Sequence, residues 1–179
     1  MSPPRARSNW ISSGYTQALI GLLVTVAAVL TFALLTPGTH IDGKVAPGFQ
    51  LRSLSVRGSS VSLATDKGFP VVLTFFASWC EPCRTELPML AKVAQTAGGK
   101  VRFIGVDVAD SLQGGRQLVR SAGVTYPVGI DKGSRVADGL YHLAGLPDTV
   151  FVSAGGRILH VAQGQLDRAQ ALRWVRKLL

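Results

Sequence analysis

The chain has 179 residues, of which 47% are hydrophobic and 16% are charged, with 19 Lys and Arg against 10 Asp and Glu. This apolar content excludes a disordered chain, and two cysteines cannot by themselves complete a four-ligand zinc site. The basic residues are scattered almost singly along the sequence, which is typical of a solvated surface. We therefore expect no nucleic-acid partner.

The N-terminal part contains one apolar segment, residues 16–35 (TQALIGLLVTVAAVLTFALL). A helix of about 20 such residues is long enough to cross a bilayer. Arg5 and Arg7 precede it, which predicts a cytoplasmic N-terminus. The segment is longer than a signal-peptide core, and Thr36-Pro37-Gly38 fits a cleavage site poorly, so we expect an uncleaved anchor.

These features predict the domain organisation: a cytoplasmic N-terminus at 1–15, a transmembrane anchor at 16–35, a linker at 36–44 and an extracytoplasmic domain at 45–179. Within that domain, predicted strands alternate with predicted helices. The strands are expected at 49–51, 61–63, 71–76, 101–108, 127–130, 150–152 and 157–161. The helices are expected at 81–96, 112–122, 134–143 and from 168 to the C-terminus.

Two of these elements carry the clearest signals. Residues 71–76 (VVLTFF) form an unbroken apolar run, as in a central strand buried on both faces. Asp167 is a candidate N-cap for the last helix, whose apolar stripe is Leu172, Val175 and Leu179. Strands alternating with helices predict an α/β domain with a mixed central sheet flanked by helices.

Both cysteines lie in one motif, Trp79-Cys80-Glu81-Pro82-Cys83, at the junction of a predicted strand and helix. Unpaired N–H groups at a helix N-terminus stabilise a thiolate, which makes Cys80 a candidate nucleophile. Cys83, one turn later, could resolve the mixed disulfide that forms. Pro82 costs no helical hydrogen bond in the first turn, and we expect Trp79 to cover one side of the site.

Two other uses of the cysteine pair are disfavoured. A structural disulfide would close so few residues that it would restrain little of the unfolded chain. A Cu(I) site would normally bring Met or His beside the thiols, but Met89 lies two turns away. The motif therefore favours dithiol redox chemistry, with no metal and no cofactor other than the Cys80–Cys83 disulfide.

The domain resembles the membrane-tethered bacterial thioredoxin-like group that includes TlpA, ResA and CcmG. The resemblance rests on Ala46-Pro47-x-Phe49-x-Leu51, Phe75 to Cys83 (FFASWCEPC), Pro88 and Leu146-Pro147-Asp148-Thr149. It implies a thioredoxin fold with an N-terminal hairpin and a central insertion. It also implies a single-pass protein of the bacterial cytoplasmic membrane.

The resemblance further implies roles for individual residues. Pro147 should be cis and should expose the Leu146 backbone beside Cys80 for a client chain. Glu86 corresponds to the buried acid that assists proton transfer, whereas Thr74 replaces the buried Asp of thioredoxin. Asp148 and Glu81 place negative charge near the thiols, which disfavours thiolate and predicts a reductant.

The predicted function is therefore a thiol–disulfide oxidoreductase that reduces client protein disulfides outside the cytoplasmic membrane. The resemblance implies apocytochrome c as a client, and a membrane protein of the thiol-transfer type as electron donor. The alternatives are an oxidase or isomerase of secreted proteins and, in another class, a Cu(I) chaperone for a membrane oxidase. A thiol peroxidase would need Thr at position 77, which is Ala.

Overall fold

The computed structural model describes residues 20–25 and 42–179. Residues 20–25 are helical, and within them the Thr25 hydroxyl donates a hydrogen bond to the Leu22 carbonyl at 2.8 Å. The rest of the predicted anchor, the predicted cytoplasmic N-terminus and most of the predicted linker lie outside the described residues. Within the two described ranges, none of the helices combines the length and hydropathy required for a membrane crossing.

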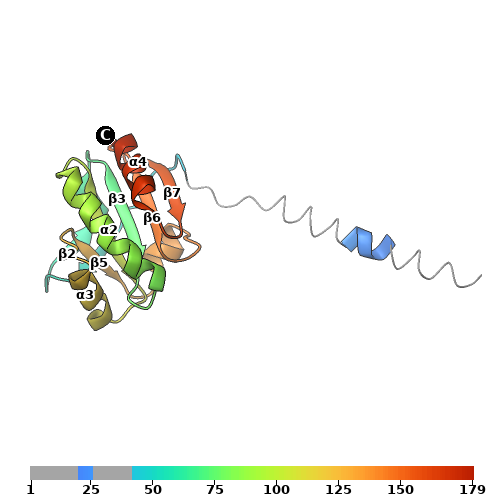
Figure 1. Cartoon of the computed structure of the whole chain (residues 1–179), viewed down its shortest axis with the longest axis horizontal. Coiled ribbons are helices and arrows are strands. Elements are labelled where there is room, and N and C mark those ends of the chain that lie inside the picture. The colour runs from blue at the N-terminus through green and yellow to red at the C-terminus, as the bar shows by residue number, and fades with distance from the viewer. Residues whose placement is uncertain (1–19, 26–41) are drawn as a thin grey trace, which may run out of the picture. The chain divides into compact units, whose positions relative to one another are not determined.

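Residues 42–179 contain a seven-stranded mixed sheet with the order β2-β1-β5-β4-β3-β6-β7 (Figure 1). Strands β3, β4 and β5 run parallel, whereas β6 and β7 on one side and β1 and β2 on the other are added antiparallel. The strands are β1 (Gln50–Ser53), β2 (Ser60–Ser62), β3 (Val71–Phe76), β4 (Arg102–Val108), β5 (Val128–Asp131), β6 (Asp148–Val152) and β7 (Ile158–Gln163).

Strand β3 lies between β4 and β6, and all six of its residues are buried, as the apolar run predicts. Its side chains alternate between the two faces of the sheet. Val71, Leu73 and Phe75 contribute to one hydrophobic cluster, while Val72 and Phe76 belong to clusters on the other face. Strand β3 thus contributes to the hydrophobic core on both faces of the sheet, and it ends shortly before the motif that contains the cysteines.

The long helices cover one face of this sheet. They are α2 (Glu81–Ala97), α3 (Leu112–Ser121) and α4 (Arg168–Leu178), and Figure 1 shows α2 beside α4 across the front of the strands. The opposite face is covered by a π-helix, η2 (Arg135–Leu140), and by Tyr141, whose ring contacts Phe49 and Phe75. A short 3-10 helix, η1 (Leu63–Asp66), follows β2.

The antiparallel pairing of β1 with β2 confirms the expected N-terminal hairpin. The segment between α2 and β6 is long, as expected for the insertion, and contains β4, α3, β5 and η2. The helix predicted over 134–143 is wrong in type and extent, because the structure has six residues of π-helix there. Its first turn is fixed by the Asp131 carboxylate, which accepts hydrogen bonds from the backbone N–H groups of Val136 and Ala137, both at 2.9 Å.

Helix α4 begins where the sequence predicts. Asp167 is its N-cap and forms a capping box with Gln170, each side chain accepting a hydrogen bond from the other residue's backbone N–H. The predicted apolar stripe is only partly right. Ala171, Val175 and Leu178 are the buried positions, whereas Leu179 is 68% exposed because it follows the end of the helix.

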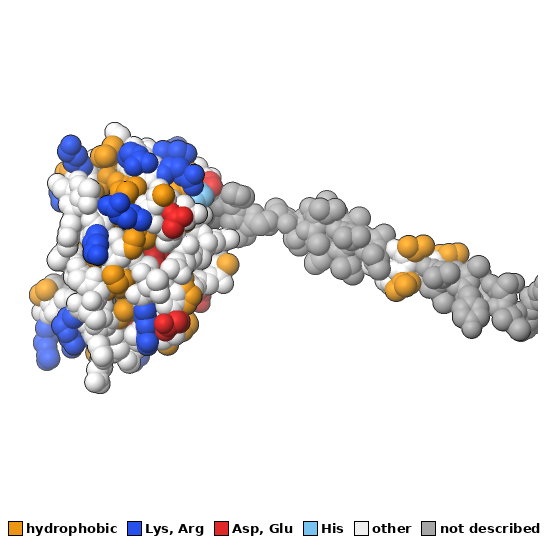
Figure 2. All heavy atoms as spheres, viewed as in Figure 1, with side chains coloured by type: hydrophobic (Ala, Val, Ile, Leu, Met, Phe, Trp, Pro, Cys, Tyr) orange, Lys and Arg blue, Asp and Glu red, His pale blue; other side chains and the backbone are white. Residues whose placement is uncertain are grey.

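Basic side chains are distributed over the domain surface. Figure 2 shows Lys and Arg spread over the visible face among apolar and neutral side chains, with few acidic groups between them. Among the basic side chains of the domain, the Arg102 guanidinium lies over the ring of Phe69 at 4.5 Å from its centroid.

Candidate active site

Cys80 and Cys83 form a disulfide at the N-terminus of α2, with an S–S distance of 1.98 Å and a Cα–Cα distance of 5.3 Å. The chain leaves β3 at Phe76 and enters the helix at Glu81, so that Cys80 is the N-cap with an extended backbone. Pro82 occupies the first turn, where its missing N–H costs no helical hydrogen bond. Cys80 therefore lies in the short turn between β3 and α2, and Cys83 lies in the first turn of α2.

The two sulfurs have different surroundings. The backbone N–H of Cys83 donates to Sγ of Cys80 at 3.3 Å, and no such contact is made to Sγ of Cys83 among the described residues. Cys80 is 5% exposed and Cys83 is 1% exposed. In the dithiol, the same N–H group and the helix N-terminus would stabilise negative charge on Cys80, so the geometry suits Cys80 as the attacking sulfur.

Other residues of the motif lie at the surface. Trp79 is 62% exposed and donates from Nε1 to the Ala109 carbonyl at 3.3 Å, so its indole is bonded to the turn that follows β4. Glu81 is exposed and forms an ion pair with Arg84 at 3.5 Å. Its charge is therefore partly neutralised and screened by water, and it influences the thiols less than the sequence suggests.

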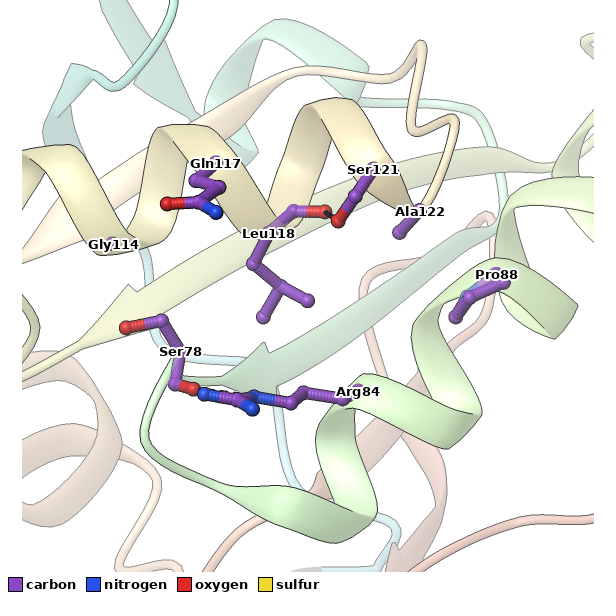
Figure 3. A pocket seen from close by; sticks show the side chains of 8 residues that line it. All are labelled: Ser78, Arg84, Pro88, Gly114, Gln117, Leu118, Ser121 and Ala122. Atoms are coloured by element: carbon purple, nitrogen blue, oxygen red, sulfur yellow. Dashed lines mark hydrogen bonds between the residues drawn. The ribbon is translucent and has the colours of Figure 1, made fainter.

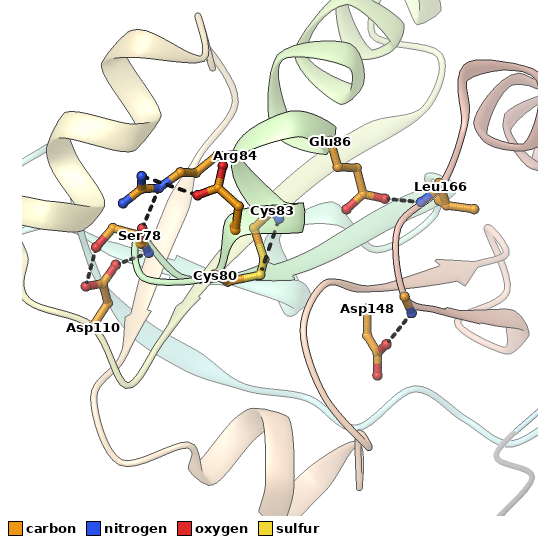
Figure 4. Close-up of a disulfide and its surroundings, with 10 residues drawn as sticks. Ser78, Cys80, Cys83, Arg84, Glu86, Asp110, Asp148 and Leu166 are labelled. Carbon is orange, nitrogen blue, oxygen red and sulfur yellow. Dashed lines mark hydrogen bonds and ion pairs between the residues drawn. A yellow bond between two sulfur atoms is a disulfide. The ribbon is translucent and has the colours of Figure 1, made fainter.

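Glu86 is buried on α2, one turn after Cys83, and is 2% exposed. One of its oxygens accepts a hydrogen bond from the Leu166 backbone N–H at 2.9 Å (Figure 4). Burial raises the pKa of Glu86 to about 7, the Leu166 hydrogen bond opposes that rise, and the charge of Asp148 adds to it. A carboxyl with this pKa can both release and accept a proton near neutral pH.

Asp148 reaches the same region from the start of β6. It is 1% exposed and accepts a hydrogen bond from the Gly164 backbone N–H at 3.1 Å. Burial raises its pKa, while backbone N–H groups of Gly164, Gly145 and Ala144 oppose the rise. Figure 4 shows Glu86 and Asp148 on the same side of the disulfide, both bonded to the segment between β7 and α4.

The predicted client-binding loop also lies at the disulfide. The peptide bond between Leu146 and Pro147 is cis, as the resemblance implies, and the partly buried Leu146 packs against the hydrophobic cluster that contains both cysteines.

Thr74, on β3, is fully buried, and its hydroxyl has no hydrogen-bond partner among the described residues.

On the other side of the disulfide, Asp110 binds the residue before Trp79. Its carboxylate accepts hydrogen bonds from the backbone N–H and from the hydroxyl of Ser78, the latter at 2.8 Å (Figure 4). The Arg84 guanidinium donates from Nε to the Ser78 carbonyl at 2.8 Å. Ser78 is thus held at both its N–H and its C=O, which fixes the backbone that leads into Cys80.

A groove of about 400 Å³ adjoins this contact between α2 and α3 (Figure 3). Ser78 and Arg84 form one end, next to the active-site loop, while the rest is contributed by the two helices. It is lined by Ser78, Arg84, Pro88, Gly114, Gln117, Leu118, Ser121 and Ala122.

The structure brings the predicted site residues together around one disulfide, from the ends of β3 and β6 and from the first turns of α2. Sequence reasoning missed the acidic residues on the far side, Asp107 and Asp110. Asp107, inside the otherwise apolar run of residues 103–108, was the available signal, because a buried carboxyl in a strand requires a partner. Within the described residues, no group of three or more His, Cys, Asp or Glu could hold a metal ion.

Comparison with known proteins agrees with this chemistry. Residues 43–161 match the AhpC/TSA family. The chain is 36% identical over 158 residues to thiol-disulfide oxidoreductase ResA of Oceanobacillus iheyensis, covering 81% of this chain and 79% of that protein. It is 32% identical over 131 residues to ResA of Bacillus subtilis, covering 72% of this chain and 70% of the relative.

A solved structure gives the same result for the fold. The crystal structure of a DsbF homologue from Corynebacterium diphtheriae superposes with a TM-score of 0.68 at 27% identity, covering 80% of this chain and 96% of that one.

Proposed function

Because the chain belongs to the AhpC/TSA family and is a thiol–disulfide oxidoreductase of the ResA type, we propose that it reduces disulfides of client proteins through Cys80 and Cys83. The observation that carries this proposal is the position of the disulfide at the N-terminus of α2, beside a buried carboxyl with a pKa of about 7. The helix N-terminus stabilises the thiolate of Cys80, and the Glu86 carboxyl can accept and release a proton near neutral pH.

The first step is attack by the Cys80 thiolate on the client disulfide. A bond forms between Cys80 Sγ and one client sulfur, the client S–S bond breaks, and the released client sulfur takes up a proton. The Cys83 N–H that contacts Cys80 Sγ supports this role, because a donated hydrogen bond stabilises the thiolate.

In the second step Cys83 resolves the mixed disulfide. It loses its proton and attacks Cys80 Sγ, which forms the Cys80–Cys83 disulfide and releases the second client sulfur as a thiol. The client gains two electrons and two protons, and the pair loses them. Glu86 lies three residues after Cys83 on the same helix face, so it is placed to accept the proton that Cys83 must lose.

We assign the net direction to reduction because of the acids around the pair. Glu86 and Asp148 are buried, and negative charge on either would disfavour a thiolate at the cysteines. When the thiolate is not stabilised, the reduced dithiol is less stable relative to the disulfide, so the pair acts as a reductant. Glu81 contributes less than the sequence suggests, since it is exposed and paired with Arg84.

We place the reaction outside the cytoplasmic membrane, with residues 16–35 as the anchor. The support is the uncharged segment after Arg5 and Arg7, together with the resemblance to membrane-tethered reductases. Apocytochrome c is the client that this resemblance suggests, and the electrons would come from a membrane protein of the thiol-transfer type. The cis loop at Leu146–Asp148 is the segment on which we expect the client chain to pair.

Trapping of mixed disulfides tests the assignment. The full chain with Cys83→Ser should accumulate disulfide-linked client complexes in its native membranes, because the attacking sulfur remains and the resolving one is absent. The matched variant Cys80→Ser should accumulate none. Complexes that form through Cys83 in the Cys80→Ser variant would reverse the two roles, and oxidised clients accumulating in the wild type would favour the oxidase.

A further inference from the structure

Asp107 is a carboxyl on the fully buried part of β4 and is 0% exposed. It pairs in register with Phe76 on β3 and with Ile130 on β5, so it lies among apolar strands. No N–H or O–H group of another described residue donates a hydrogen bond to either of its oxygens. An ionised carboxylate in this position would be strongly disfavoured, and the group therefore requires a proton.

Two consecutive glycines of α3 face the carboxyls of Asp107 and Asp110. An added Cβ would lie 3.1 Å from Oδ1 of Asp110 at Gly114 and 2.1 Å from Oδ2 of Asp107 at Gly115. Asp110 is the side chain that interacts with Asp107. Burial is the largest cause that raises the pKa of Asp107 to about 8, and the charge of Asp110 and a side-chain hydrogen bond with it add to the rise. A protonated Asp107 is a donor. Asp110 is the matching acceptor, and its oxygens already receive the Ser78 contacts and the Ser111 backbone N–H at 2.6 Å.

Among the described residues, no cation acts on Asp107 from the other elements around it. On α3 the neighbour is Gly115, where an added Cβ would lie 2.1 Å from Oδ2 of Asp107. On β5, Asp131 follows the partner Ile130, so its side chain points to the opposite face of the sheet, where it binds η2. Arg116 on α3 donates to the Leu54 carbonyl. Asp110 is thus the one ionisable group that acts on Asp107 within the described residues.

Asp110 connects this buried carboxyl to the active-site loop. It holds Ser78 by two hydrogen bonds, and the next residue, Trp79, donates to the Ala109 carbonyl at 3.3 Å. Cys80 follows directly. The loop that carries the attacking sulfur is therefore attached to the turn between β4 and α3 through Asp110.

We propose that Asp107 is a positioning residue for Cys80: its protonated carboxyl donates a hydrogen bond to the Asp110 carboxylate, and the resulting carboxyl pair holds the Ser78–Trp79 backbone in place. Loss of the proton puts two negative charges on adjacent carboxylates and weakens the hold on Ser78. The inference rests on the proposed role of Cys80 as the attacking sulfur.

The hold on Ser78 can be measured in the oxidised full chain, in which neither cysteine titrates. The backbone N–H of Ser78 and the indole N–H of Trp79 should change chemical shift with a midpoint near pH 8, the pKa of Asp107. In Asp107→Asn, whose amide remains a donor at every pH, both signals should be independent of pH in this range. Asp131→Asn, which alters a buried carboxyl on the opposite face, should keep the wild-type midpoint.

The effect on the thiol is read in the reduced full chain by alkylation of Cys80 at about pH 6.5. Asp107→Leu, which removes the donor, should slow alkylation by about threefold or more, and Asp107→Asn should restore it to within about twofold of wild type. A Ser78 midpoint near pH 8 that persists in Asp107→Asn would overturn the proposal, as would equal alkylation rates in Asp107→Leu and wild type. Client reduction that survives Cys80→Ser would overturn both this inference and the proposed function, whereas the Ser78 midpoint tests the carboxyl pair independently of any client.

Discussion

Replacing Glu86 by Gln should make the stability of the oxidised protein less sensitive to pH. The folded protein raises the pKa of Glu86 from 4.5 to about 7, so the folded state keeps a proton that the unfolded chain has released. The stability that this proton contributes is fully present below pH 4.5 and is lost as the pH rises through the folded pKa. The difference between the two pKa values corresponds to about 3 kcal/mol.

The assay is denaturant unfolding of the oxidised full chain at a series of pH values from about 4 to about 8. The free energy of unfolding of Glu86→Gln, relative to wild type, should increase by about 3 kcal/mol over this range, because Gln has no proton to lose. Asp107 and Asp148 titrate in both proteins and largely cancel in the difference. Since Asp148 acts on Glu86, the measured midpoint belongs to the pair.

Glu81→Gln is the matched control for this experiment, because Glu81 is a carboxylate of the same helix that is exposed to solvent. It should not reproduce the change of about 3 kcal/mol, because that change comes from the burial of Glu86. If the difference between Glu86→Gln and wild type is the same at every pH, Glu86 is not held protonated by burial. Its assignment as the proton acceptor for Cys83 would then lose its physical basis.

Three further substitutions test the packing around the site. Thr74→Val removes a buried hydroxyl that has no partner among the described residues, so unfolding experiments should show equal stability or a gain of about 1 kcal/mol. Gly115→Ala places a methyl group on the Asp107 carboxyl and should cost about 1–3 kcal/mol, part of which the double variant with Asp107→Ala should restore. Asp167→Ala removes the capping box with Gln170 and should cost about 1 kcal/mol without changing thiol alkylation.

The sequence predicts those elements of the fold that depend on short-range features, such as an apolar run or a helix cap. The apolar run Val71–Phe76 gives the central strand, and Asp167 gives the start of α4. The composition of the segment around Val136 predicts an ordinary helix. Its π-helical form depends on Asp131, at the end of β5, and on Ser134 with a left-handed φ of 52°, neither of which a periodic pattern reveals.

The active site also combines residues that spacing in the sequence places together and residues that only tertiary packing places. Cys80, Cys83 and Glu86 lie within one turn-and-helix segment, so spacing alone places them near one another. Asp107 acquires its environment from the register of β4 with β3 and from the approach of Gly115, which are tertiary features. The exposure of Glu81 and the burial of Asp148 could not be read from the sequence either, since both depend on how the loops around the disulfide pack.

The reduction potential of the Cys80–Cys83 pair tests the central claim most directly. The full chain would be equilibrated with defined ratios of oxidised and reduced thiol buffer, and the oxidised fraction would be measured by alkylation and mass. The buried acids near the pair predict a potential near that of thioredoxin, about −270 mV, as a reductant requires. A potential near that of DsbA, about −120 mV, would contradict the account and identify the pair as an oxidant.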